Sequence, residues 1–251
     1  MFGFLRRAAS AEPAPQVPAG IAVYAIGDIH GRLDLLSDLL GKIEEDAKSC
    51  REARRILVFV GDYVDRGPDS RGVVERVLAG VPTFETVCLK GNHEQVLLDF
   101  LADPLVWDHW RRFGGLETLA SYQVDRHLLF GANVAPAAIR DAFAEALPQR
   151  HKDFLASLPR SYECGDYYFV HAGVRPGIPL ERQVEADQLW IREDFLDSGK
   201  TTGGRVVVHG HTPRPAPEKL DFRIGIDTGA YLTGRLTAVK LIGPQVTFLQ
   251  S

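Results

Sequence analysis

The residues Gly61-Asp62-Tyr63-Val64-Asp65-Arg66-Gly67 directly follow the apolar run 56–60. That run is short and rich in β-branched residues, as expected of a buried strand in a parallel sheet. The loop after it carries two carboxylates and a guanidinium within five residues. Ligands of open α/β sheets bind in loops at the carboxyl ends of strands. We therefore expect this loop to form part of a functional site.

The same arrangement, a predicted strand followed by a polar loop, occurs at four other places. The loops are Gly27-Asp28-Ile29-His30-Gly31, Gly91-Asn92-His93-Glu94, His171-Ala172-Gly173 and His209-Gly210-His211-Thr212. Together, the five strand ends supply Asp, Asn and His side chains. Such a set is typical of metal ligands and poorly suited to a hydrophobic core.

Helical spacing of apolar residues separates the first three predicted strands, which gives a β-α-β-α-β order. This order favours parallel pairing with right-handed crossovers. Between about residues 104 and 160 the strand pattern gives way to a helical insertion. Strands then return, and the last two read as an antiparallel hairpin. We predict one catalytic domain over residues 21–251, preceded by a flexible leader over residues 1–20.

The composition is that of a globular protein, with 45% hydrophobic and 25% charged residues. A net charge of −4 gives no support to a nucleic-acid or anionic-membrane surface. The three cysteines form no closely spaced pair, and no apolar run is long enough to span a bilayer. We therefore expect a cytoplasmic protein without a nucleic-acid or membrane partner. The sequence leaves its oligomeric state open.

The candidate ligands suit a pair of metal ions. Asp28 and His30 stand two residues apart and can turn toward one ion, whereas the carboxylate of Asp62 can bridge two ions. Asn92, His171 and a histidine from the 209–212 loop add one amide oxygen and two imidazoles. Mixed oxygen and nitrogen ligands suit Mn, Fe or Zn better than Ca or Mg. A bridging carboxylate fits a two-metal hydrolytic site.

These motifs, in this order, resemble the phosphoprotein phosphatase (PPP) family of calcineurin-like metallophosphoesterases, in particular its bacterial and bacteriophage branch, which includes lambda phosphatase. The resemblance runs from about residue 21 to residue 231. It implies a four-layer α/β/β/α sandwich. It also implies two divalent metal ions, most often manganese, with iron and zinc as alternatives.

The resemblance further implies a role for each motif residue. Asp28 and His30 would bind one metal ion, Asp62 would bridge both, and Asn92, His171 and His211 would bind the other. We choose His211 over His209 because the family's ligand is the histidine of Gly-His-Thr. The remaining positions would be catalytic: His93 as general acid, Asp65 as the carboxylate that orients it, and Arg66 and Arg192 as phosphate-binding arginines.

The function that the resemblance favours is a metal-dependent phosphomonoesterase in which a metal-bridging hydroxide attacks phosphorus directly. A serine/threonine protein phosphatase is the leading interpretation, with phosphotyrosine, phosphohistidine or small phosphomonoesters as further substrates. Glu94 supports it mildly, because dinucleotide hydrolases tend to carry Asp at that position. The alternatives are a symmetrical dinucleoside-polyphosphate hydrolase and an inactive phosphoprotein-binding module.

Overall fold

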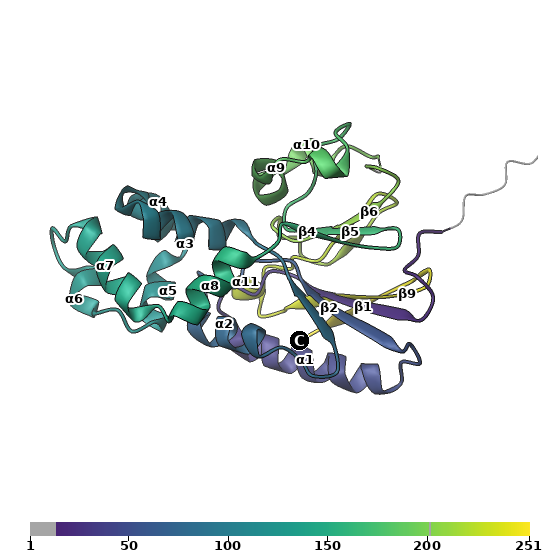
Figure 1. Cartoon of the computed structure of the whole chain (residues 1–251), viewed down its shortest axis with the longest axis horizontal. Helices are drawn as coiled ribbons and strands as arrows, with labels where there is room; N and C mark the ends of the chain where they lie inside the picture. Colours follow the sequence, from purple (N-terminus) through teal and green to yellow (C-terminus); the bar gives the residue numbers. More distant parts are fainter. Residues whose placement is uncertain (1–13, 201) are drawn as a thin grey trace, which may run out of the picture.

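Two five-stranded sheets lie face to face in the computed structural model, which describes residues 14–200 and 202–251 (Figure 1). The first sheet has the order β10-β9-β1-β2-β3 and the second β4-β5-β6-β8-β7. The strands of the first sheet are β1 (Ile21–Ile26), β2 (Arg54–Phe59), β3 (Glu85–Cys88), β9 (Thr237–Ile242) and β10 (Gln245–Gln250). Those of the second are β4 (Ser161–Cys164), β5 (Tyr167–Val170), β6 (Val206–His209), β7 (Glu218–Lys219) and β8 (Arg223–Gly225).

Parallel pairing brings the polar loops together. β1, β2 and β3 pair in parallel, as the sequence predicts, and β5, β6 and β8 pair in parallel in the second sheet. Because parallel strands end at the same edge of a sheet, the loops that follow them gather at one end of the sandwich. The hairpin β9–β10 pairs antiparallel to β1, also as predicted.

Alternation along the central strands builds two hydrophobic layers. On β1 and β2, Val23 and Val58 face the second sheet, whereas Tyr24 and Leu57 face the helices α1 (Leu33–Lys48) and α2 (Ser70–Ala79). The outer face of the second sheet packs against the short helices α9 (Glu185–Trp190) and α10 (Glu193–Leu196). The predicted four-layer α/β/β/α sandwich is therefore confirmed (Figure 1).

Helices fill the region from residue 104 to residue 157, beyond α3 (Asn92–Ala102). They are the α-helices α4 (Trp107–Trp110), α5 (Gly115–Ser121), α6 (Arg126–Phe130), α7 (Pro136–Ala146) and α8 (Gln149–Ser157), with the 3-10 helices η1 (Pro104–Val106) and η2 (Arg111–Phe113). Trp107 and Trp110 are buried against Phe100 of α3, with ring centroids 5.6 and 5.0 Å apart. This aromatic cluster joins the helical region to α3. The helical region lies to one side of the sandwich (Figure 1).

The leader predicted over residues 1–20 falls only partly within the described residues, since residues 1–13 lie outside them. Residues 14–20 pack against the sandwich: Val17 is buried, and its N–H donates to the carbonyl of Gly243 at 3.2 Å. The carbonyl of Gln16 accepts from the N–H of Asp166 at 2.9 Å. The packed part of the chain thus begins before Ile21, where the sequence had predicted its start.

The sequence did not indicate several short elements, namely β4, β7, η3 (Leu180–Arg182), α9, α10 and α11 (Ala230–Thr233). Each has six residues or fewer, too few for a hydrophobic period to show. Within the described residues, no helix is both long and apolar enough to cross a membrane.

Candidate active site

The five polar loops meet in a cleft of about 190 Å³ at the end of the sandwich. Eight of the ten predicted site residues line it: Asp28, His30, Asp62, Arg66, Asn92, His93, Arg192 and His211. The other two, Asp65 and His171, are fully buried directly behind the lining. Residues more than 180 positions apart in the chain are thus brought to one site by the strand order.

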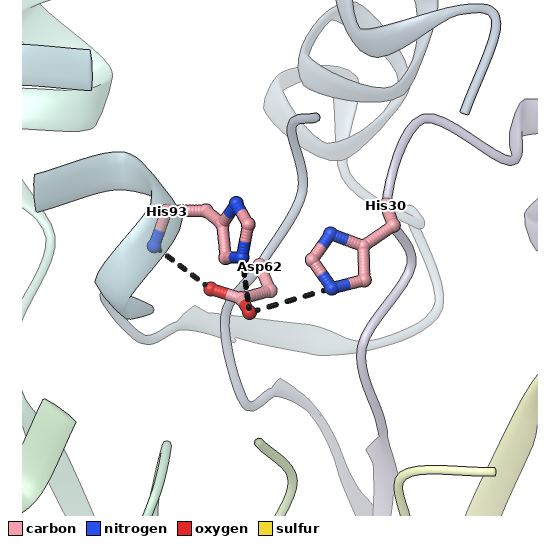
Figure 2. Close-up of side chains that lie close together, drawn as sticks. All are labelled: His30, Asp62 and His93. Atoms are coloured by element: carbon pink, nitrogen blue, oxygen red, sulfur yellow. Dashed lines mark hydrogen bonds and ion pairs between the residues drawn. The ribbon is translucent and has the colours of Figure 1, made fainter. Parts of the chain in front are cut away.

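The carboxylate of Asp62 lies between histidines from several loops. Its Oδ2 is 3.5 Å from Nε2 of His30 and 3.8 Å from Nε2 of His93. Dashed lines mark both contacts in Figure 2. Its Oδ1 lies 3.5 Å from Nε2 of His171 and accepts from the backbone N–H of His93 at 3.1 Å. One carboxylate therefore faces both sides of the cleft, as a bridging ligand must.

Two of these histidines direct a bare nitrogen toward Asp62. Nδ1 of His30 lies 2.9 Å from the carbonyl of Val64, and Nδ1 of His171 lies 3.0 Å from the carbonyl of Val60. A carbonyl only accepts, so both Nδ1 atoms carry the proton in the neutral ring. Each Nε2 then carries no proton, and its lone pair is free to bind a metal ion. This orientation of imidazole by a backbone carbonyl is common around metal ions.

A second group of donor atoms converges beside Asp62. Oδ1 of Asn92 lies 2.8 Å from Nε2 of His171 and 2.9 Å from Nδ1 of His211, and the two nitrogens are 3.2 Å apart. Only Nδ1 of His211 could offer a proton to this group. That tautomer would leave Nε2 of the same ring, which is buried and has no hydrogen-bond partner among the described residues, without a proton.

Lone pairs directed at one another repel, and a cation between them removes the repulsion. Burial and the neighbouring His171 lower the pKa of His211 to about 2, and burial and His93 lower the pKa of His30 to about 3. Both rings are therefore neutral and ready to ligate at neutral pH. Two groups have ligand atoms within 4.8 Å of one another, and both contain Asp62: His30 with His93, and His171 with His211. The residues present thus fit a pair of metal ions.

The carboxylates of the cleft strongly influence one another. Burial acts to raise the pKa of Asp62, but the surrounding imidazoles, led by His171, outweigh it and hold that pKa low. Burial and the nearby Asp227 raise the pKa of Asp28, whose carboxylate accepts from the N–H of His211 at 3.0 Å. Burial also raises the pKa of Asp227, to about 6. An ion with positive charge would offset this crowding of acids.

Asp227 is a site residue that the sequence analysis missed. It stands two residues after the end of β8 and lines the cleft. The signal was present, because Asp227-Thr228-Gly229 repeats the pattern of a strand followed by an acidic loop.

His93 and Asp65 form a tight pair. Nδ1 of His93 lies 2.6 Å from Oδ2 of Asp65, which also accepts from Nε1 of Trp110 at 2.9 Å. The other oxygen of Asp65 accepts from Oγ1 of Thr118 at 2.6 Å. Burial acts to lower the pKa of His93, but Asp62 and Asp65 outweigh it and raise that pKa. The helical insertion therefore holds the carboxylate that orients His93 and favours its protonated form.

The two arginines have different neighbours at the cleft. Arg66 donates to the hydroxyl of Tyr231, and its guanidinium carbon lies 4.6 Å from the centre of the same ring. Arg192 donates to Oγ1 of Thr212 at 3.3 Å. Both guanidinium groups line the cleft, where they can bind the oxygens of a phosphate.

Backbone strain is concentrated in these loops. Seven non-glycine residues of the described chain have positive φ, and five of them belong to the site: His30, Asp62, Asp65, Arg66 and His211. Residues held in this sparsely populated conformation cluster at functional sites. Close packing adds to the constraint, since a Cβ on Gly210 would lie 1.9 Å from Oδ1 of Asp28.

Two residues of the motifs have structural rather than chemical surroundings. The buried carboxylate of Glu94 accepts from the backbone N–H groups of residues 62, 63 and 91 at 2.8–2.9 Å, and so ties two loops together. His209 is buried and does not line the cleft, and its ring lies 5.2 Å from that of Phe195. Glu94 therefore stabilises the packing of the loops and gives no information about the substrate.

The family model for calcineurin-like phosphoesterases matches residues 21–234. The chain belongs to the calcineurin-like phosphoesterase family. Its fold agrees with solved members: a candidate diadenosine tetraphosphatase gives a TM-score of 0.61 at 24% identity, covering 95% of this chain and 99% of that one. A protein serine/threonine phosphatase from Saccharomyces cerevisiae gives 0.56 at 15% identity, covering 94% and 84%.

The curated relatives of this calcineurin-like phosphoesterase are not named as protein phosphatases. A protein of Anoxybacillus flavithermus is 28% identical over 86% of this chain and 88% of its own length, and one of Bacillus subtilis is 28% identical over 88% and 91%. Both are named bis(5'-nucleosyl)-tetraphosphatase PrpE [asymmetrical].

These relatives correct the sequence-based interpretation. The prediction of a serine/threonine protein phosphatase is wrong, and the dinucleoside-polyphosphate alternative is favoured in its place. The comparisons identify the wider family and not the bacteriophage phosphatase branch. Protein phosphatases and dinucleotide hydrolases need the same metal ligands and acid, so the five motifs could not separate them. Glu94 was the one position used to choose between the two substrate classes, and its carboxylate instead binds backbone N–H groups of two loops.

Proposed function

We propose that this chain is a metal-dependent hydrolase of dinucleoside polyphosphates that cuts the phosphate chain asymmetrically. The observation that carries the metal-dependent chemistry is the set of bare donor atoms directed at Asp62 from both sides. The substrate class is supported by the relatives, whose matches span most of both chains. The name of those relatives also favours asymmetrical over symmetrical cleavage. The catalytic unit is residues 21–251, with the helical region 104–160 as one wall of the cleft.

We assign one metal ion to Asp28, His30 and Asp62, and the other to Asp62, Asn92, His171 and His211. Two divalent cations held there would supply an activated water and positive charge for the phosphate. The mixed oxygen and nitrogen donors suit manganese, with iron or zinc as alternatives. We place His93 outside this ligand set as the acid, with its Nδ1 held by Asp65.

The other side chains bind the substrate and move a proton. Arg66 and Arg192 bind phosphate oxygens and offset the charge that grows on them. His93, protonated and held by Asp65 through Nδ1, delivers the proton on Nε2 to the oxygen of the leaving polyphosphate. Its Nε2 lies 3.4 Å from the guanidinium of Arg66, so acid and phosphate-binding group are adjacent.

The test compares substrates on manganese-loaded protein. We expect kcat/KM for diadenosine tetraphosphate to exceed that for p-nitrophenyl phosphate and for phosphoserine peptides by at least tenfold. The products should be a nucleoside monophosphate and a nucleoside triphosphate. Faster turnover of the monoesters would contradict the substrate class, and two diphosphate products would contradict asymmetrical cleavage. Failure to turn over any of these substrates would instead support a binding module.

A further inference from the structure

Two exposed aromatic side chains flank the cleft. Phe113 and Trp190 are 41% and 42% exposed, whereas Trp107 and Trp110 are buried. Phe113 ends η2 in the helical region, and Trp190 ends α9 on the outer face of the second sheet, so they come from separate parts of the molecule (Figure 1). Both line the same cleft as the metal-binding donors. Because both exposed rings line one cleft, they offer a flat apolar group a place to bind.

Each residue is placed next to the reacting groups. The carbonyl of Gly114, the neighbour of Phe113, accepts from the N–H of Arg66 at 3.3 Å. The ring of Trp190 stands edge-on to that of His211, at 85° and 6.2 Å between centroids. An edge-on contact leaves the faces of the indole free to stack on another flat group.

We propose that Phe113 and Trp190 bind one nucleobase of the substrate by stacking and so place the phosphate next to that nucleoside at the metal-binding donors. This inference rests on the proposed function and adds the residues that select the substrate. Trp190 lies directly beside a proposed ligand ring. A base stacked on it would bring the phosphate next to its own nucleoside, rather than a more distant one, to the donors.

This placement decides which bond breaks. Water adds to the phosphorus nearest the stacked nucleoside, and the bond from that phosphorus to the bridging oxygen breaks. The water oxygen stays on the nucleoside monophosphate. The leaving polyphosphate takes the electron pair and a proton from His93, so that a tetraphosphate yields a monophosphate and a triphosphate.

Alanine variants test the stacking residues. For Phe113→Ala and Trp190→Ala, we expect the ratio of kcat/KM on diadenosine tetraphosphate to kcat/KM on p-nitrophenyl phosphate to fall about 5- to 150-fold. This range corresponds to about 1–3 kcal/mol for a base stacked on an aromatic ring. The change should appear in KM, and Trp190→Phe should restore most of it. Phe130→Ala is the matched control, because Phe130 is exposed on the same helical region but does not line the cleft.

A binding measurement gives a readout independent of turnover. The chain has three tryptophans, and only Trp190 among them is exposed. Adenosine monophosphate should protect its fluorescence from iodide quenching, whereas ribose 5-phosphate should not. Equal protection by both compounds, or by neither, would overturn base stacking.

Hydrolysis in ¹⁸O-labelled water tests the placement. Label in the monophosphate supports it, and label in the triphosphate overturns it. The two proposals also fail differently. If the wild-type protein cleaves diadenosine tetraphosphate but both alanine variants keep its substrate ratio, the stacking proposal is wrong and the proposed function stands. If the wild-type protein does not cleave it, the proposed function is wrong, and the quenching measurement decides the base site separately.

Discussion

Nδ1 of His93 lies 2.6 Å from Oδ2 of Asp65, and the same oxygen accepts from the indole N–H of Trp110. The imidazole is thereby fixed with its other nitrogen toward the cleft. A histidine held in this way by a buried carboxylate is suited to give a proton to a leaving group. Because Trp110 belongs to the helical region, this part of the fold contributes to the chemistry as well as to the wall of the cleft.

Replacing the acid should affect substrates according to their leaving groups. We expect His93→Asn to reduce kcat about 10²–10⁴-fold on alkyl phosphates, the usual range for general acid help. The loss should be smaller on p-nitrophenyl phosphate, whose leaving group needs little protonation. Metal content, measured by elemental analysis, should stay at the wild-type value. Equal losses on both substrates would show that His93 does not act as the acid.

Glu94 should matter for stability. Its buried carboxylate accepts from three backbone N–H groups of two loops at 2.8–2.9 Å, and Glu94→Gln would turn an amide N–H toward some of them. We expect a loss of about 2–4 kcal/mol in the free energy of unfolding, measured by urea denaturation. Glu117→Gln is the control on an exposed helical glutamate and should change stability by less than about 0.5 kcal/mol. An unchanged free energy of unfolding in Glu94→Gln would contradict the structural role of Glu94.

Gly114 should be needed both for its backbone conformation and for its lack of a side chain. Its φ is +103°, and a Cβ would lie 2.3 Å from the backbone nitrogen of Arg66. Gly177 shares the positive φ, at +79°, but has open space around it. Gly177→Ala should cost only the left-handed strain, about 1–2 kcal/mol. Gly114→Ala should cost more in a thermal melt and should also raise KM, because it displaces Arg66. Equal effects of the two variants would contradict this contact.

The contacts of Asp46 predict that the stability of the protein depends on pH. It accepts from the hydroxyl of Tyr24 and from Nζ of Lys240, both at 2.6 Å. Burial acts to raise the pKa of Asp46, but Lys240 and Tyr24 outweigh it and lower that pKa. The stabilisation is therefore present above the unfolded pKa of about 3.9 and is lost as the pH falls through the folded value.

Urea denaturation at several pH values tests this dependence. Asp46→Asn should lose about 1 kcal/mol at pH 7, and the difference from wild type should vanish in acid. Asp38→Asn removes only an exposed pair with Lys42 and should change stability little at any pH. A difference that stays constant down to pH 2 would contradict the assignment.

Much of the fold could be read from the sequence because its signals are local. The runs that became β1, β2 and β3 have the composition of buried strands, and the loops after them carry the polar residues of the cleft. Parallel pairing then brings those loops together. The ten candidate residues and their roles, Arg192 among them, came from the family resemblance that these motifs carry. Short elements such as β4 and β7 gave no such signal, since their pairing depends on distant strands.

The parts that the sequence did not reveal depend on packing between distant segments. Nothing near Trp110 or Thr118 indicates that both bind Asp65, about 50 residues earlier. Phe113 and Trp190 likewise belong to different segments and meet only at the cleft. The substrate class depends on such walls rather than on the motifs, which is why the protein phosphatase interpretation failed.

The central claim is that the donors around Asp62 hold two metal ions. The most direct measurement is anomalous scattering from crystals of the manganese-loaded protein. We predict two peaks about 3.5–4 Å apart with the carboxylate of Asp62 between them, and the loss of both peaks in Asp62→Asn. A single peak in fully active protein, or two full peaks in Asp62→Asn, would contradict the account.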